Sequence, residues 1–411
     1  MTGLDAAAQA TALATAGDRT RRAEALRQQA EANGVWPASI APVYAGLADG
    51  SVAPMTVPAM NVRGLTYRVA RAAWRTALRC EAGPLLFELA PSEAEAGDQP
   101  FDEYAAMVLA AAAREGYRGP VFLQADHIDV ASAAEGALER ARQRCREALA
   151  AGFRQVDIDA AGLAVEGSDP AVRQGANASA TAELTAYVQT LEPTVVVGGE
   201  VGEIGGANTT VDDLRAFLAA VLARVPDGMR GLGKVSVQSG TRHGGVVRSD
   251  GSVGAMAVDV DLLAALAHVA RTEFGLPGVV QHGASTLTMA QLARLPAVGV
   301  IEVHLATGIQ NVVLDHPALP SDLIERMRAD LVGPLTHAEG GHHDDAEATA
   351  AQAFVQNRWR AWGRFKPALW QLPEAVLQDI DVSLEAWFEQ LFTALGVAGR
   401  AAELDRVEVP G

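Results

Sequence analysis

Residues 120–126 read PVFLQAD, a short apolar run that ends in a carboxylate and precedes a polar loop and an alanine-rich segment. The same succession of apolar run, loop and alanine-rich segment occurs eight times along the chain. The runs lie too far apart for tight turns, and the intervening segments have helical periodicity, so the pattern indicates parallel strands joined by crossover helices. The predicted strands are residues 56–61 (TVPAMN), 84–89 (PLLFEL), 120–126 (PVFLQAD), 155–159 (QVDID), 194–200 (TVVVGGE), 234–239 (KVSVQS), 278–282 (GVVQH) and 300–305 (VIEVHL).

Eight such units predict an α/β fold, a (β/α)8 TIM barrel with helices outside the sheet. The predicted helices of the outer ring are residues 67–79, 101–115, 133–151, 180–191, 211–225, 259–274 and 288–295. Outside the barrel we expect an N-terminal helix over residues 4–33 and a tryptophan-bearing helical tail over 346–395. The chain therefore divides into an N-terminal helical extension (1–50), a barrel catalytic domain (51–335), and a loop with a C-terminal helical tail (336–411).

The composition narrows the classes of function. Of 411 residues, 49% are hydrophobic and 20% charged, which is typical of a globular protein with a large core. The formal net charge of −17 disfavours nucleic acid and anionic membrane surfaces as partners. The sequence shows no secretion signal and no apolar stretch of transmembrane length. Only two cysteines occur, Cys80 and Cys145, so we expect a cytoplasmic protein.

Polar side chains close most of the predicted strands, and in such barrels the chemistry lies at the carboxyl ends of the strands. Three histidines and a glutamate from different strands, a donor set that zinc accepts, are expected to meet there. Alternatively, each histidine is an ordinary polar rim residue satisfied within its loop, although only nine histidines occur in the chain. The strand-end residues are Asn61, Glu88, Ser92, Asp126, His127, Asp159, Glu200, His243, His282, His304 and Thr307.

Two of these histidines stand in glycine-flanked loops, residues 240–245 (GTRHGG) and 282–286 (HGAST), and a third such loop begins at Thr307-Gly308. Without side chains on the glycines, backbone N–H groups can approach an anion closely, so the loops favour a phosphate site beside the metal. The plainer interpretation is that the glycines only permit tight turns.

The motifs resemble, in order along residues 54–320, those of the class II metal-dependent fructose-bisphosphate aldolases and their ketose-bisphosphate relatives. The resemblance rests on four motifs taken together with Asp126-His127, although each alone is weak. The remaining motifs are residues 200–206 (EVGEIGG), 240–244 (GTRHG), 282–285 (HGAS) and 304–307 (HLAT).

The resemblance implies a role for each matching residue. Three histidines would hold zinc, Glu200 would reach the same metal or an alternative position, and Asp159 would belong to a site for a second or monovalent cation. Asp126 would exchange a proton with the substrate hydroxyl. The histidines are His127, His243 and His282. The residues expected to bind substrate or its phosphate are Asn61, Gly244, Gly283, Ser285, His304 and Thr307.

Several positions depart from the family pattern. His304 and Ala306 replace the usual asparagine and aspartate of the last-strand motif, Ala207 and Asn208 replace a pair of glutamates, and Gln124 stands in place of a histidine. We therefore expect a divergent member. The predicted activity is reversible aldol cleavage or condensation of a phosphorylated ketose by a zinc-dependent lyase, through a metal-stabilised enediolate.

Two other classes compete with this prediction. A non-catalytic subunit that supports a tagatose-bisphosphate-type aldolase would suit the changes at 207, 208 and 306, but it would not need to keep Asp126 and three histidines. A zinc hydrolase of the amidohydrolase kind would carry a His-x-His pair on the first strand, which here ends in Asn61. From the apolar extensions we also expect a homodimer or higher homo-oligomer.

Overall fold

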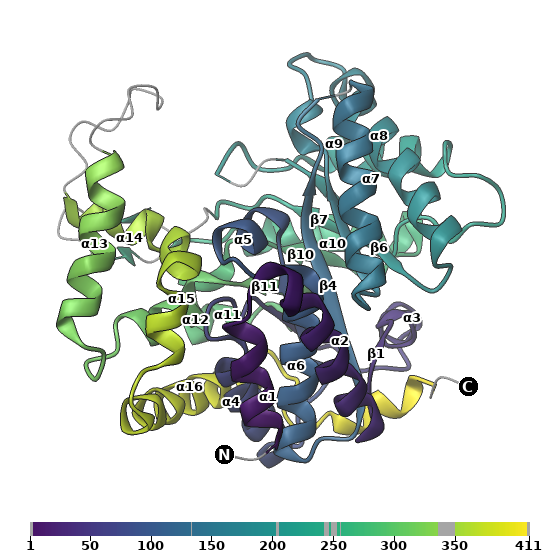
Figure 1. Ribbon diagram of the computed structural model, residues 1–411. Helices are drawn as coiled ribbons and strands as arrows, with labels where there is room; N and C mark the ends of the chain where they lie inside the picture. Colours follow the sequence, from purple (N-terminus) through teal and green to yellow (C-terminus); the bar gives the residue numbers. More distant parts are fainter. Residues whose placement is uncertain are drawn as a thin grey trace.

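The computed structural model describes residues 3–132, 134–202, 205–241, 246–247, 253–254, 256–335 and 350–408. Eight parallel strands form a closed sheet in the order β4-β3-β2-β11-β10-β7-β6-β5, and the pairing of β5 with β4 closes it. Helices surround the strands (Figure 1). The predicted (β/α)8 barrel is confirmed. Its strands are β2 (Val57–Met60), β3 (Leu86–Leu89), β4 (Gly119–Asp129), β5 (Gln155–Asp159), β6 (Val196–Val201), β7 (Lys234–Val237), β10 (Val279–Gln281) and β11 (Val300–Leu305).

Helices with one buried side surround the barrel. In α6, all of its alanines and large apolar residues except the first and the last, Phe101 and Ala113, are fully inaccessible, and Gly116 (φ 89°) ends the helix in the left-handed region. α8 begins at Pro170, with Asp169 capping the N–H of Ala171, and not at 180 as predicted. The outer helices are α4 (Thr66–Arg79), α6 (Phe101–Glu115), α7 (Glu135–Ala150), α8 (Pro170–Leu191), α9 (Val211–Leu222), α10 (Val260–Phe274), α11 (Met289–Leu292) and α12 (Thr307–Leu314), with the short α5 (Pro91–Ala96) after β3.

The N-terminal extension differs from the prediction. Two helices, α1 (Gly3–Ala12) and α2 (Ala16–Ala32), replace the single helix expected over 4–33. A ninth strand, β1 (Val35–Ala38), runs parallel to the first part of β4, and α3 (Ala41–Asp49) follows it. Pro37 made this run a poor strand candidate, but proline is tolerated at the margin of a sheet. The extension is therefore partly built into the sheet.

The C-terminal part is helical, as expected, and packs along the barrel. It contains α13 (Ser321–Leu335), α14 (Ala350–Asn357), α15 (Trp362–Trp370) and α16 (Glu374–Ala394), and the predicted polar loop 336–345 lies outside the described residues. α16 lies beside α4 (Figure 1), where Arg75 bridges Asp381 and Glu385 at 2.8 and 2.7 Å. None of the described helices is long and apolar enough to cross a membrane.

The C-terminal helices bury their large apolar side chains against the barrel of the same chain. Trp362 is 1% exposed and packs on Gly64. Several large apolar side chains remain exposed in the described part of the chain. The homo-oligomer stays a prediction that a monomeric mass in light scattering would contradict. These exposed side chains are Leu13, Leu78, Val165, Val172, Leu191, Leu222 and Val382.

A buried ion pair fastens α15 to α6. Lys366 Nζ lies 2.8 Å from Glu103, and both side chains are at least 97% buried. Replacing Lys366 by methionine should lower the free energy of unfolding by about 3 kcal/mol, because Glu103 keeps only the more distant Arg19 as a charged partner. Adding Glu103→Leu to Lys366→Met should recover most of this loss, since an apolar pair needs no desolvated charges. Urea unfolding of both variants measures the difference; equal stabilities would contradict the prediction.

Candidate active site

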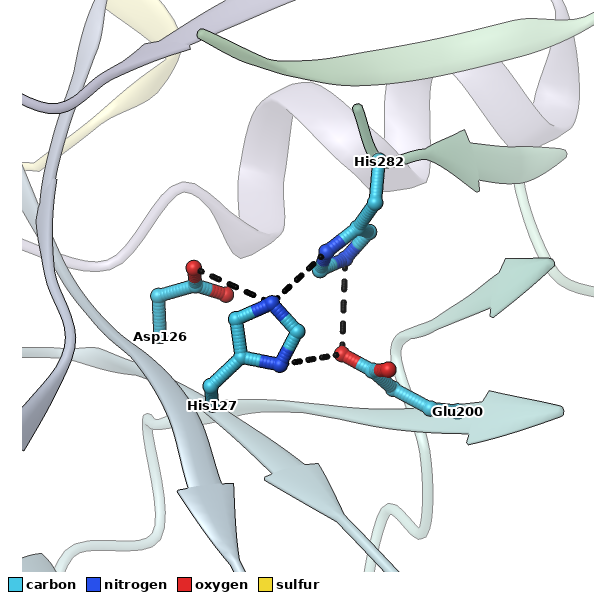
Figure 2. Close-up of side chains that lie close together, drawn as sticks. All are labelled: Asp126, His127, Glu200 and His282. Atoms are coloured by element: carbon cyan, nitrogen blue, oxygen red, sulfur yellow. Dashed lines mark hydrogen bonds and ion pairs between the residues drawn. The ribbon is translucent and has the colours of Figure 1, made fainter. Parts of the chain in front are cut away.

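Four of the predicted strand-end residues meet inside the carboxyl end of the barrel (Figure 2). Asp126 and His127 come from β4, Glu200 from β6, and His282 directly follows β10. His127 Nε2 lies 3.2 Å from His282 Nδ1, and its Nδ1 lies 3.3 Å from Glu200 Oε1. His282 Nε2 is 3.5 Å from the same Glu200 oxygen, and Asp126 Oδ2 is 3.7 Å from His127 Nε2. The strand ends thus converge as the barrel prediction required.

An irregularity in β4 brings neighbouring residues into one cluster. In a regular strand, Asp126 and His127 would point to opposite faces of the sheet. The register between β4 and β5 shifts between Ala125 and Ile128, and His127 has φ 45°, in the left-handed region. This break in the pleat lets both side chains lie against the same partners. Such strained positions often serve function.

The donor set fits a metal ion such as zinc. Glu200 is 2% exposed, and its Oε1 accepts no hydrogen bond from any described residue, although two imidazoles face it. A buried carboxylate oxygen left in this state is costly, and a cation bound by that oxygen and two imidazoles would compensate it. Asp126, His127, Glu200 and His282 are close enough together to share one ion. His243 and Gly244 lie outside the described residues, so the third predicted histidine is not placed.

The charges of the cluster perturb its titration. Burial raises the pKa of Glu200 well above its usual value, and the charge of Asp159 adds to this. Burial would lower the pKa of His127, but Asp126 and Glu200 outweigh it and hold the pKa well above the usual value. Asp159 itself is partly exposed, with Oδ2 3.0 Å from His127 Nδ1, so it touches the cluster from the rim. Shifts of this kind are typical of functional sites.

The other predicted residues lie around this cluster at different depths. Asn61 donates to Glu93 of α5 and does not touch the histidines in the described contacts. Gly283 (φ 68°) leads into a short turn in which Ser285 Oγ accepts from the N–H of Ala306, 2.8 Å away, just before α12 begins at Thr307. The structure therefore brings two of the three predicted phosphate loops, residues 282–286 and the loop at Thr307-Gly308, side by side, while residues 242–245 of the other loop lie outside the described residues.

The family model for class II fructose-bisphosphate aldolases matches residues 47–354, well over half of the chain. The chain belongs to the class II fructose-bisphosphate aldolase family. This family accounts for the order of the motifs and for the barrel. A search of curated proteins finds no match.

Solved structures similar to this family member share its fold at low identity. The fructose-bisphosphate aldolase of Campylobacter jejuni is 16% identical, with a TM-score of 0.54 over 89% of this chain and 96% of that one. A probable tagatose 6 phosphate kinase from Sinorhizobium meliloti 1021 is 17% identical, with a TM-score of 0.58 over 83% and 100%. The fructuronate-tagaturonate epimerase UxaE of Cohnella laeviribosi is 13% identical, with 0.58 over 84% and 82%. Proteins named as an aldolase, a kinase and an epimerase share this fold, so the fold alone does not identify the reaction. The reaction has to be inferred from the residues of the site.

Beneath the histidines, this class II aldolase relative has a charged layer that sequence reasoning missed. The fully buried Lys234 lies 2.6 Å from Glu302 and 2.9 Å from Asp157, and it donates to Gln124 at 2.5 Å. The signal was available, because polar residues two apart on β4, β5 and β11 share the inward face. Asp126, Asp157, His282 and His304 also stand close enough to hold an ion, but the Lys234 ammonium already supplies Asp157 with a cation.

Glu88 of β3 borders this layer and has an unusual titration. Burial raises the pKa of Glu88 to about 8, and the attraction of His304 only partly opposes this. The folded protein therefore favours the protonated form of Glu88. The contribution of Glu88 to the free energy of unfolding is fully present below the pKa that this carboxyl has in the unfolded chain, and it is lost as pH rises through about 8.

Glu88→Gln should accordingly gain stability relative to the parent between pH 5 and pH 9, because glutamine stays neutral. Thermal unfolding midpoints of both proteins with chelator present, across this pH range, measure the effect. Glu166→Gln on the exposed loop is the control and should show a constant difference from the parent. A constant difference for Glu88→Gln as well would contradict the shifted pKa.

Proposed function

We propose that this protein is a zinc-dependent lyase of the class II aldolase type that reversibly cleaves a phosphorylated ketose. The observation that carries the proposal is the contact of a buried carboxylate, Asp126, with the His127, Glu200 and His282 cluster at the carboxyl end of the barrel. Family membership supports this class of chemistry.

Zinc would be held by His127 and His282, with Glu200 and the undescribed His243 as further ligands; Asp159 is proposed for a second cation at the rim. When bound, a zinc ion acts as a Lewis acid that polarises a carbonyl oxygen. The contact of Ser236 Oγ with His282 Nε2 at 2.9 Å and of Asp159 with His127 Nδ1 at 3.0 Å would orient the two rings.

Asp126 would act as the base that takes the proton from the substrate hydroxyl next to the breaking bond. Burial would raise the pKa of Asp126, but His127 and His304 together hold it well below its usual value, so the carboxylate is ionised and can accept a proton. The residues of the paired loops, Gly283, Ser285 and Thr307, are proposed to hold the substrate phosphate and so orient the bond for cleavage.

The lysine of the barrel is unsuited to a Schiff-base mechanism. Lys234 is 0% exposed, and its ammonium contacts oxygens of three side chains between 2.5 and 2.9 Å. The charges of Asp157 and Glu302 raise the pKa of Lys234 above its usual value even though burial opposes this. A protonated, enclosed amine cannot attack a carbonyl. We also propose a cytoplasmic location, which suits two free cysteines.

The test is an assay of phosphorylated ketoses, and of dihydroxyacetone phosphate with candidate aldehydes, before and after chelation. We expect turnover that chelator abolishes and zinc or cobalt restores, and no covalent adduct after borohydride treatment with substrate. Undiminished activity of the metal-free protein would refute zinc dependence. An inactive protein that forms a stable complex with a second aldolase chain would instead favour the non-catalytic supporting subunit.

A further inference from the structure

We propose that His304 is a positioning residue for Asp126, through a column of side-chain contacts formed by Lys234, Glu302, His304 and Asp126. The column starts in the barrel interior at Lys234 and ends at the metal cluster. This inference rests on the proposed function, because it assigns a task to residues that support the proposed base.

The lower half of the column is a fixed anchor. Glu302 Oε1 lies 2.6 Å from Lys234 Nζ, and its Oε2 accepts from the Tyr44 hydroxyl of α3. Gln124 Nε2 also donates to Glu302 Oε1, at 2.9 Å. All four side chains are at most 3% exposed. The carboxylate of Glu302 therefore has partners on every side, and a satisfied buried network of this kind is rigid.

The upper half holds the imidazole of His304 between carboxylates. Nε2 lies 2.7 Å from Glu302 Oε1, while Nδ1 lies 2.9 Å from Glu88 Oε2 and 3.2 Å from Asp126 Oδ1. The ring stacks on His282, with centroids 3.9 Å apart and an angle of 22° between the planes. Glu302 and the stacked His282 therefore hold the ring, and Nδ1 faces the carboxylates of Glu88 and Asp126 at ion-pair distance without an aligned hydrogen bond.

The fixed ring of His304 restricts the orientation of the Asp126 carboxylate. Its Oδ1 faces His304, and its Oδ2 faces His127 Nε2. The carboxylate is thus set between the column and the proposed metal ligands, in the way that a catalytic base is oriented by a third group. The predicted contact of His304 with substrate or phosphate is less favoured, because the side chain is 5% exposed and both ring nitrogens face carboxylates.

The test compares His304→Ala, His304→Gln and the exposed-surface control His268→Ala by zinc content, KM and kcat. For His304→Ala we expect full zinc, KM within about threefold of the parent, and kcat lower by ~10²-fold, the scale of a lost contribution to acid–base chemistry. Added imidazole, which can bridge both carboxylates, should restore at least a tenth of kcat, whereas 1-methylimidazole should not. His304→Gln fills the space but bridges poorly, so it should also lose kcat.

A double-mutant cycle on thermal stability tests the contact between His304 and Asp126 without relying on enzyme activity. Thermal midpoints of Asp126→Asn, His304→Gln and the double variant should be non-additive, because the two side chains are in contact. Additive midpoints, or His304 variants with parental kcat, would overturn the inference while leaving the lyase intact. If the parent turns over no ketose but the midpoints are non-additive, the proposed function fails and the column stands.

Discussion

Asp126→Asn should keep a full complement of zinc and lower kcat by ~10²- to 10⁴-fold, the usual contribution of a positioned acid–base group. Asparagine preserves the size of the side chain but cannot accept the hydroxyl proton. Metal should remain because His127, Glu200 and His282 still face one another at 3.2 to 3.5 Å. Elemental analysis and steady-state kinetics on the same preparation measure both quantities.

Asp129→Asn provides a matched control, because the same change is made on the same strand at an exposed position beyond the cluster. It should retain activity close to that of the parent. An Asp126→Asn variant as active as the parent would show that another group takes the proton. Loss of zinc from that variant would instead place Asp126 among the metal ligands.

His282→Ala should bind zinc more than ~100-fold more weakly and lose activity, because removing a direct ligand costs more than the 10- to 100-fold effect of removing a supporting residue. His282 is 1% exposed and contacts both His127 and Glu200. In the variant, only water can take the place of its imidazole as a ligand of the ion. Zinc content after dialysis against a graded series of chelator concentrations gives the change in affinity.

Two further variants sharpen this measurement. His268→Ala removes an exposed histidine of α10 and should leave zinc affinity unchanged. His243→Ala tests the third predicted ligand and should behave like His282→Ala. Parental zinc affinity in His282→Ala would refute the ligand assignment.

The barrel was predictable because its strands carry a strong, repeated signal. Two predicted strands, β5 and β11, have the bounds expected from their apolar runs. Convergence of His127, Glu200 and His282 followed from one geometric rule, that parallel strands end at the same rim. Helix bounds were harder to predict: the expected N-terminal helix is divided into α1 and α2, and Thr15, with an extended backbone (ψ 155°), stands just before α2.

The charged layer beneath the site was missed for a different reason. Strand ends were considered, but not the residues two positions earlier on the same face. Asp157 and Glu302 were therefore overlooked, and Gln124 was noted only as a departure from the family pattern. The partner that makes this layer possible, Lys234, lies on a strand remote in sequence. Only a folded barrel shows that these charges neutralise one another.

The short strand β1 has a consequence for any shortened form of this protein. It pairs with Gly119 to Phe122 of β4, on the side where β5 pairs with β4 only from Gln124 onward. The family match starts at residue 47, after β1. A fragment trimmed to the matched span would leave the first residues of β4 with a bare hydrogen-bonding edge, a template for aggregation between chains. In the full chain β1 covers this edge, so we expect a fragment without the N-terminal extension to aggregate more readily than the full chain.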